Sequence, residues 1–241
     1  MTTPPTRVGV LFSGGKDSTY AAYVATRKGD KVSCLITLAP ARSDSYMFHY
    51  PNIRMTALQA EAMLLPQVMV DTDGVKEEEL ADLRKAIAKA KREYSIEAVY
   101  TGAIASVYQK SRVERTCSDL GVRVVSPLWH IDPISHLNNL VANGFRVILT
   151  GVAALGLDES WLGRSLDAQA IRDLARLSAR YGVNPGLEGG EGETFVLDCP
   201  LFERRIEVSA SKKHWEKDAG YLEILEARLV AKGSEDPVPR R

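Results

Sequence analysis

The 241-residue sequence has few cysteines, no excess of either charge and no long apolar run. Its cysteines, Cys34, Cys117 and Cys199, lie far apart and form no C-x-x-C pair, which argues against a disulfide framework or a cysteine zinc site and indicates a reducing compartment. Lysine plus arginine equal aspartate plus glutamate at 31 each, so no overall field attracts a polyanion. No stretch approaches the roughly 18 apolar residues of a membrane span, and the first residues lack a signal pattern. We therefore expect a cytoplasmic protein that binds neither nucleic acid nor membrane.

What the sequence does contain is a hydrophobic content of 45%, enough for a core, and a regular alternation of short apolar runs with helical stretches. This alternation predicts a parallel sheet covered by helices on both faces. The predicted strands are 7–12, 32–38, 67–71, 98–102 and 122–125, with an amphipathic helix over 80–94. After residue 126 we predict helices over 132–143 and 167–181, and strands over 146–150, 194–197, 204–209 and 222–229. We thus expect an α/β nucleotide-binding domain with a five-stranded parallel sheet over 1–126, and a smaller α+β substrate-binding domain over 127–241.

A glycine turn between the first strand and the first helix has the features of a phosphate-binding loop. The loop consists of Ser13, Gly14, Gly15, Lys16, Asp17 and Ser18. Glycines let the backbone approach a phosphate, hydroxyls and exposed N–H groups supply donors, and the start of a helix favours an anion. Lys16 can neutralise phosphate charge, and Asp17 can help to hold Mg²⁺. We expect both side chains to leave an exposed loop.

The alternative interpretation of this loop is a tight turn capped by one of its serines, but the strand, loop and helix context favours phosphate binding. The loop is neither a Walker A sequence nor a Rossmann G-x-G-x-x-G. Open parallel sheets bind ligands at the carboxyl ends of their strands, so we expect a nucleotide on this loop to lie across the ends of the first and fourth strands. The predicted neighbours of its base, an adenine if the nucleotide is ATP, are Thr37, Leu38, Gly102, Ala103 and Ile104.

Three glutamates separated by glycines form a second candidate site. Carboxylates this close in sequence repel one another and gain nothing from burial unless a cation joins them, so a cation is expected. The alternative is an exposed acidic loop that binds nothing. The candidate substrate-binding residues of this segment are Glu188, Gly189, Gly190, Glu191, Glu193 and Thr194.

Several other side chains are candidates for contact with a substrate. Tyr108, Gln109 and Arg112 lie on one predicted helix just after the fourth strand, where open sheets bind ligands. The alternative for Arg112 is an ordinary surface charge. Trp161 offers an aromatic face that suits a cation, against the more common role of a core or lid residue.

The motif S-G-G-x-D-S at 13–18 resembles the signature of the PP-loop (N-type ATP pyrophosphatase) superfamily. Further blocks resemble the diphthine-ammonia ligase family and together cover nearly the whole chain. The most specific block is E-G-G-E-G-E-T at 188–194, in which Gly192 stands where relatives carry a bulky, often aromatic residue. The other blocks are 45–49, 58–62, 101–106 with 108–109, and 156–164.

This resemblance implies that ATP, carried with Mg²⁺, is cleaved between its α and β phosphates to adenylate a carboxylate, which ammonium then converts to an amide. The carboxylate would be that of diphthine on elongation factor 2. The catalytic residues would be Lys16, Asp17, Glu191 and Glu193, and His49 would lie near the nucleotide. The glutamate segment would bind Mg²⁺, ammonium or the trimethylammonium group of diphthine. We expect it to serve the acceptor and ammonia half of the reaction, separate from the phosphate loop; a homodimer is left open.

Two other functions remain as alternatives. A PP-loop enzyme that modifies transfer RNA, a thiolase or a lysidine-type synthetase, needs a large basic surface, and thiolases often carry paired cysteines. The zero net charge and the scattered cysteines argue against both. The third function is a module that senses ATP without turning it over, for which a second charged site has no use.

Overall fold

The computed structural model describes residues 4–40, 52–72 and 78–233. The chain forms two compact units, which are described separately. The first comprises Met1–Ser13 and Asp17–His130, and the second comprises Gly14–Lys16 and Ile131–Arg241. Three residues of the phosphate loop thus belong to the second unit, although the residues on either side of them belong to the first.

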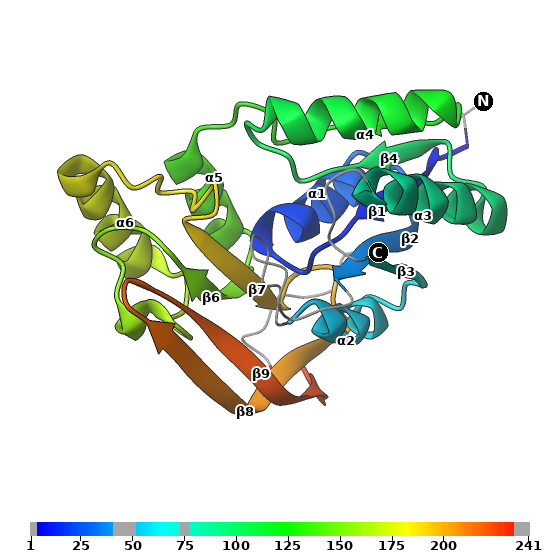
Figure 1. The fold of residues 1–241 in the computed structure, drawn as a ribbon. Helices are drawn as coiled ribbons and strands as arrows, with labels where there is room; N and C mark the ends of the chain where they lie inside the picture. The colour runs from blue at the N-terminus through cyan, green and yellow to red at the C-terminus, as the bar shows by residue number, and fades with distance from the viewer. Residues whose placement is uncertain (1–3, 41–51, 73–77, 234–241) are drawn as a thin grey trace. The chain divides into compact units, whose positions relative to one another are not determined.

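The first unit is built on a five-stranded parallel sheet with the strand order β3-β2-β1-β4-β5 (Figure 1). Its strands are β1 (Arg7–Leu11), β2 (Lys31–Pro40), β3 (Gln67–Thr72), β4 (Ala98–Tyr100) and β5 (Arg123–Val125). Its helices are α1 (Lys16–Arg27), α2 (Thr56–Ala62), α3 (Glu78–Tyr94) and α4 (Val107–Asp119), with the short 3₁₀ helix η1 (Ile53–Met55). The predicted α/β class, the five strands and the helix before β4 are confirmed.

Helices α3 and α4 pack on one face of this sheet. Ile87 of α3 and Val113 of α4 share a buried cluster with Ile36 of β2 and Val99 of β4. Gly9 of β1 lies under this cluster, where a Cβ atom would come within 2.9 Å of the Ile36 side chain. Because the chain steps from β1 to β2 in one direction along the sheet and from β3 to β4 in the other, right-handed crossovers place α1 on the opposite face.

The neighbouring strands β1 and β4 mark the point where the direction of winding reverses. The segments that follow these two strands therefore run to opposite sides of the sheet. Such a switch point is where open α/β sheets bind their ligands. The loop after β1 is the predicted phosphate loop, and the segment after β4 contains Gly102.

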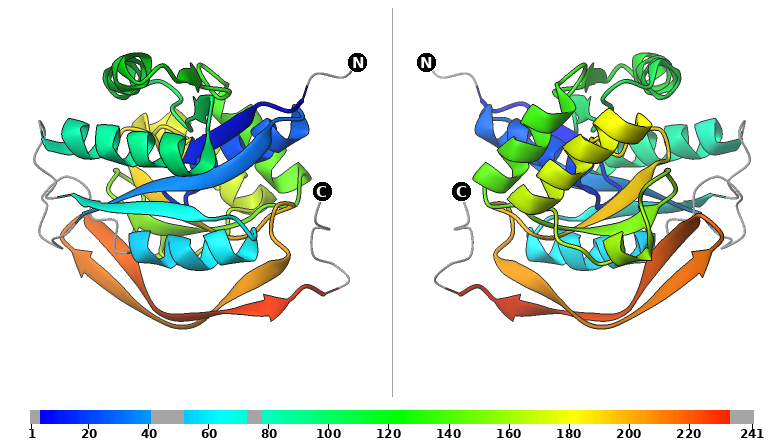
Figure 2. Two further views of the ribbon diagram at one scale, coloured as in Figure 1. Left: turned by 90° about the vertical axis from the view of Figure 1, so that its right-hand side faces the viewer. Right: turned by 90° about the vertical axis from the view of Figure 1, so that its left-hand side faces the viewer.

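The second unit contains a four-stranded sheet of order β7-β6-β9-β8, in which neighbouring strands are antiparallel. Its elements are α5 (Pro133–Ala142), β6 (Arg146–Val152), η2 (Glu159–Trp161), α6 (Ala168–Tyr181), β7 (Gly192–Asp198), β8 (Arg204–Glu216) and β9 (Ala219–Ala231). Figure 2 shows α5 and α6 side by side and β8 with β9 as a long two-stranded ribbon. The expected α+β character is confirmed, and β8 extends well beyond the predicted strand 204–209.

Short side chains set the helix starts of this unit. Asp132 accepts a hydrogen bond from the Ser135 N–H at 2.8 Å, and Asp167 accepts one from the Ala170 N–H at 2.8 Å. Each carboxylate satisfies a donor that the first turn leaves unpaired, so the helices begin where the sequence predicts. Helix α6 ends at Gly182, whose φ of 76° suits a left-handed cap. Within the described ranges, no helix has the length and apolar character needed to cross a membrane.

Candidate functional site

The predicted phosphate loop is a tight turn between β1 and α1. Gly14 has φ = 80°, a conformation that glycine adopts without steric cost. The Ser18 hydroxyl accepts a hydrogen bond from the Ser13 N–H at 3.3 Å and lies 3.3 Å from the Ser13 hydroxyl oxygen. Helix α1 begins at Lys16, so backbone N–H groups and the positive end of the helix dipole lie at the loop. This arrangement can hold an anion such as a phosphate.

Within the second unit, the middle of the phosphate loop is bound by β7 and by Glu188, which precedes this strand. The Val196 N–H donates to the Gly14 carbonyl oxygen at 3.1 Å, and the Lys16 N–H donates to the Thr194 hydroxyl at 3.1 Å. The Lys16 ammonium lies 3.4 Å from a carboxylate oxygen of Glu188. Lys16 is only 3% exposed. The expectation that its side chain leaves an exposed loop is therefore wrong, because it lies against Glu188.

The same contacts overturn the expected separation of the glutamate segment from the phosphate loop. Glu188 pairs with the side chain of Lys16, and Thr194 binds its backbone. The expectation followed from a predicted domain boundary between the two segments and from the repulsion between clustered carboxylates and a triphosphate. The structure brings Lys16 and Glu188, which are 172 residues apart in sequence, into contact. Glu188 therefore forms part of the surroundings of the phosphate loop.

The glutamate segment does not gather its three carboxylates around one point. Glu191 accepts a hydrogen bond from the Asn184 N–H at 2.6 Å, and its carbonyl oxygen accepts one from the Ala153 N–H at 2.9 Å. Glu193 lies on β7 beside Gly151, where a Cβ atom would stand 3.0 Å from that of Glu193. Among the residues with a described placement, no three carboxylate, histidine or cysteine side chains could hold a metal ion together. A metal shared by the three glutamates is therefore not supported, whereas ammonium and trimethylammonium stay predictions.

Glycines in this segment are required by the backbone and by space. Gly189 and Gly190 have φ of 75° and 87°, and Leu187 also adopts a positive φ of 60°. A Cβ atom at Gly192 would lie 3.1 Å from the Gly151 carbonyl oxygen and 3.2 Å from the Leu187 side chain. Gly192 thus stands where this chain leaves little room for a side chain.

The predicted adenine neighbours at β2 differ in what they can offer. The Thr37 side chain is fully buried, donates to the Phe12 carbonyl oxygen at 2.8 Å and accepts from the Gln67 amide at 2.8 Å. Its hydroxyl therefore holds β1 and β3 to β2. Leu38 is half-buried. His49 lies outside the described residues, so its predicted contact with the nucleotide stays a prediction.

Of the predicted adenine neighbours after β4, Gly102 lies against the phosphate loop. A Cβ atom at Gly102 would stand 2.7 Å from the Asp17 carbonyl carbon and from the Ser18 nitrogen. Ala103 donates its N–H to the Thr101 hydroxyl at 3.2 Å, and Ile104 accepts from the His130 N–H at 2.9 Å. All these contacts are within the first unit, so the structure places Gly102 directly beside the start of α1.

Tyr108, Gln109 and Arg112 lie together in the first part of α4. The Gln109 N–H donates to the Ser106 hydroxyl at 3.2 Å, which caps the helix, and the Arg112 guanidinium carbon lies 3.5 Å from the centre of the Tyr108 ring. Sequence reasoning did not identify Lys110, whose ammonium lies 4.6 Å from the centre of the Trp129 ring. Lys110 and Trp129 belong to different segments of the chain, and no sequence pattern relates them. The contact between them is visible only in the folded structure.

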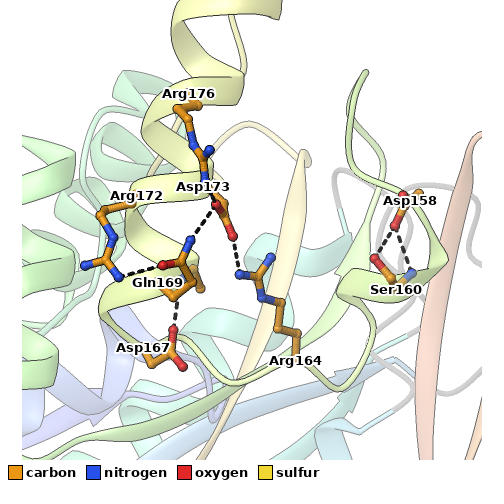
Figure 3. Close-up of polar contacts among 9 residues, drawn as sticks. Asp158, Ser160, Arg164, Asp167, Gln169, Arg172, Asp173 and Arg176 are labelled. Atoms are coloured by element: carbon orange, nitrogen blue, oxygen red, sulfur yellow. Dashed lines mark hydrogen bonds and ion pairs between the residues drawn. The ribbon is translucent and has the colours of Figure 1, made fainter.

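Trp161 is 5% exposed, and one face of its ring is covered by Arg164, whose guanidinium carbon lies 4.2 Å from the ring centre. Figure 3 shows Arg164 reaching Asp173 of α6, which also binds Arg176 and accepts from the Gln169 amide at 3.0 Å. The contact that a trimethylammonium group would make with this tryptophan is made here by the protein's own arginine. Arg164 therefore occupies the ring face of Trp161 that the predicted substrate contact would need on this side.

Two aspartates of this region have lowered pKa values. The Arg164 guanidinium, more than any other group, holds the pKa of Asp173 below its ordinary value. The Ser160 hydroxyl and N–H, at 2.5 Å and 2.9 Å from one carboxylate oxygen, lower the pKa of Asp158. Both aspartates stay ionised at neutral pH and fix the segment between β6 and α6 (Figure 3).

The cysteines offer no nucleophile. All three are buried free thiols. Burial raises the pKa of Cys34 and of Cys199 to about 12, and that of Cys117 to about 11. Because the thiolate is the reactive form, these side chains are inert at neutral pH.

The sequence matches both domains that define one protein family. Residues 6–124 match the diphthamide synthase N-terminal domain, and residues 132–230 match the diphthamide synthase C-terminal domain. This chain belongs to the diphthamide synthase family. Among the relatives of this diphthamide synthase family member is a diphthine–ammonia ligase of Bos taurus, 37% identical over 257 residues that cover 97% of this chain and 95% of the relative.

Two other diphthine–ammonia ligases match over similar lengths. That of Homo sapiens is 36% identical over 96% of this chain and 95% of its own length, and that of Danio rerio is 36% identical over 95% and 97%. A solved chain described as a predicted subunit of tRNA methyltransferase from Methanocaldococcus jannaschii is 20% identical, with a TM-score of 0.41 over 78% of this chain and 95% of its own. A structural likeness of that size supports no conclusion about function.

Proposed function

We propose that this diphthamide synthase family member is an ATP-dependent diphthine–ammonia ligase. Family membership supports the activity, and the observation that carries it is the phosphate loop. Gly14 with its positive φ stands between β1 and α1, and Gly102 lies against the first turn of the helix at the switch point of the sheet. A nucleotide with its phosphates on Ser13 to Ser18 would occupy the place where sheets of this kind bind ligands.

The proposed reaction has two steps. In the first, a carboxylate oxygen of diphthine attacks the α phosphorus of ATP, and the bond to the bridging oxygen breaks, so that pyrophosphate leaves with the electron pair. In the second, ammonium loses a proton to solvent, and the resulting ammonia attacks the carbonyl carbon of the acyl-adenylate. The attacking nitrogen loses a second proton to solvent, and AMP leaves with the electron pair of the broken C–O bond as the amide forms. The protein's work is to position the reactants and to stabilise the charge that develops on the leaving groups.

The phosphate loop would serve the first step. Lys16 and the N–H groups at the start of α1 would neutralise charge on the phosphates, and Ser13 and Ser18 would donate hydroxyl hydrogen bonds. Asp17 fits the proposed Mg²⁺, because this ion binds nucleotides through one or two carboxylates together with phosphate oxygens. Bound there, Mg²⁺ would supply further charge neutralisation.

Residues of two separate segments would serve the acceptor and ammonium. They are Glu191 and Glu193 of the glutamate segment, and Tyr108, Gln109 and Arg112 of α4. We propose elongation factor 2 that carries diphthine as the acceptor, free ammonium as the nitrogen source, and the cytoplasm as the site of action. The inert thiols agree with the use of free ammonium, because a glutamine-hydrolysing thiol nucleophile needs a reactive thiolate.

The test is a product assay with purified protein, elongation factor 2 that carries diphthine, ATP and ammonium. We expect AMP and pyrophosphate in equal amounts and a mass change of elongation factor 2 that corresponds to conversion of a carboxylate to an amide. ADP as the product would overturn the proposal. ATP binding without turnover would indicate a sensing module, and turnover that needs transfer RNA would indicate a modifying enzyme of RNA.

A further inference from the structure

Lys16 uses both of its donor groups inside the second unit. Its backbone N–H binds the Thr194 hydroxyl at 3.1 Å, and its ammonium lies 3.4 Å from the Glu188 carboxylate. A phosphate on this loop would call on the same two groups, the N–H at the start of the helix and the lysine charge. Glu188 and Thr194 therefore present oxygen acceptors to Lys16 where ATP would present phosphate oxygens.

The Lys16–Glu188 pair has the properties of a contact that can be exchanged. Its length of 3.4 Å exceeds the roughly 2.7–2.9 Å of a strong charge-assisted hydrogen bond. Lys16 is 3% exposed and Glu188 is 28% exposed, so both charges have lost much of their hydration. A charge in such a place is stabilised by an opposite charge beside it, so departure of the lysine ammonium would favour entry of another cation beside the carboxylate.

We propose that this ion pair is exchanged during the reaction: the phosphates of ATP take Lys16 from Glu188, and the ammonium substrate then takes the place of the lysine ammonium beside the Glu188 carboxylate. The inference rests on the proposed function and deepens it, because it assigns a residue to the ammonium and an order to the two substrates. ATP binds first, and its binding creates the ammonium site.

The chemistry of the displaced group identifies the ligand. The end of the lysine side chain is a primary ammonium, with a single positive charge and N–H donors. Ammonium has the same charge and the same kind of donors, and it is small enough for the space that one side-chain terminus leaves. A trimethylammonium group has no N–H donor and is larger, so it would not replace this contact.

The first experiment measures ATP affinity without any acceptor. ATP with Mg²⁺ is titrated into the wild-type protein and into Glu188→Gln by calorimetry. Because glutamine competes less well than a carboxylate for Lys16, we expect the variant to bind ATP roughly three- to tenfold more tightly. A residue that merely supports the loop would give the opposite sign. Unchanged or weaker binding in this variant overturns the exchange.

The second experiment measures the KM for ammonium at saturating ATP. Loss of a hydrogen bond between charged partners predicts an increase of about tenfold or more in Glu188→Gln, with a smaller change in kcat at saturating ammonium. Glu188→Asp keeps the charge but withdraws it by one methylene group, so its ATP affinity and its KM should both lie between those of wild type and Glu188→Gln. An unchanged KM for ammonium in Glu188→Gln overturns the proposal.

The matched control is Glu216→Gln, which removes the same charge from an exposed position at the end of β8. Both its ATP affinity and its ammonium KM should equal those of wild type. Failure of the proposed function is distinguishable, because a wild-type protein that forms no amide fails the product assay, whereas the exchange fails on the sign of the change in ATP affinity, which needs no turnover.

Discussion

Gly102 and Ser18 are so close that a Cβ atom on the glycine would stand 2.7 Å from the serine nitrogen. Real Cβ atoms essentially never approach a backbone atom to this distance, so the segment after β4 can pass the first turn of α1 only as glycine. The proximity fixes the position of the helix start, where the backbone donors of the phosphate loop lie.

The first prediction concerns this contact. Gly102→Ala should displace the start of α1, because backbone atoms cannot yield as a flexible side chain can. Overpacking of this kind costs about 1–3 kcal/mol, so we expect a lower Tm together with weaker binding of ATP. Thermal unfolding and calorimetry would measure the two effects. Ala105→Ser, at an exposed position of the same segment, adds one heavy atom and should change neither.

The second prediction concerns the catalytic role of Lys16 and Asp17. Replacement of either residue by alanine should abolish pyrophosphate release. Because Lys16 is buried against Glu188, Lys16→Met is the better variant: it keeps an apolar stem of similar length and removes only the charge. Loss of charge stabilisation on a transferring phosphate predicts a fall of about a hundredfold or more in the rate of AMP formation. Circular dichroism would verify the fold, and a normal turnover rate in Lys16→Met or Asp17→Ala would contradict the assignment.

The third prediction concerns Glu191 and Glu193, the two other carboxylates of the glutamate segment. Glu191→Gln and Glu193→Gln should change ATP affinity little and lower amide formation sharply. Glu191→Gln should also lower the free energy of unfolding by about 1 kcal/mol, because its bond from the Asn184 N–H loses the help of the charge. Titrations with ATP and product assays on the same protein samples would separate the two effects. Full amide formation in both variants would leave this segment without a role in the second step.

Local sequence patterns were sufficient to predict the strands, the principal helices and the glycine turn between β1 and α1, because these depend on residues close together in the chain. It could not predict that Lys16 lies beside Glu188, since two segments far apart in sequence are joined only by tertiary structure. The sequence also could not show that the Thr37 hydroxyl forms hydrogen bonds with neighbouring strands. A threonine occupies the same position in a strand sequence whether its hydroxyl binds a ligand or a carbonyl oxygen. The three carboxylates of the 188–193 segment predicted a shared cation, because the sequence does not show which group each side chain contacts.

The fourth prediction concerns pH and the Arg164–Asp173 pair. The arginine lowers the pKa of Asp173 in the folded protein. A lowered folded-state pKa adds stability at every pH above the unfolded value of about 3.9, and this stability is lost as the pH falls through the folded value. Asp173→Asn should therefore unfold at lower urea concentration at pH 7, and the difference from wild type should shrink below about pH 4. Asp218→Asn, at an exposed position in the turn between β8 and β9, is the control. A difference of constant size at every pH would remove the pair as its cause.

The assignment of Gly14–Lys16 to the second unit has a consequence for dissection of the gene. A fragment that ends near residue 130 would include the whole S-G-G-K-D-S motif but not Thr194, Val196 or Glu188, to which the middle of that motif is bonded. A separately expressed N-terminal half would thus carry the sequence signature of an ATP site without the bonds that shape it. In chimaeras between relatives, residues 188–196 and the glycine loop should therefore be taken from the same parent. This holds even though more than 170 residues of chain separate Lys16 from Glu188.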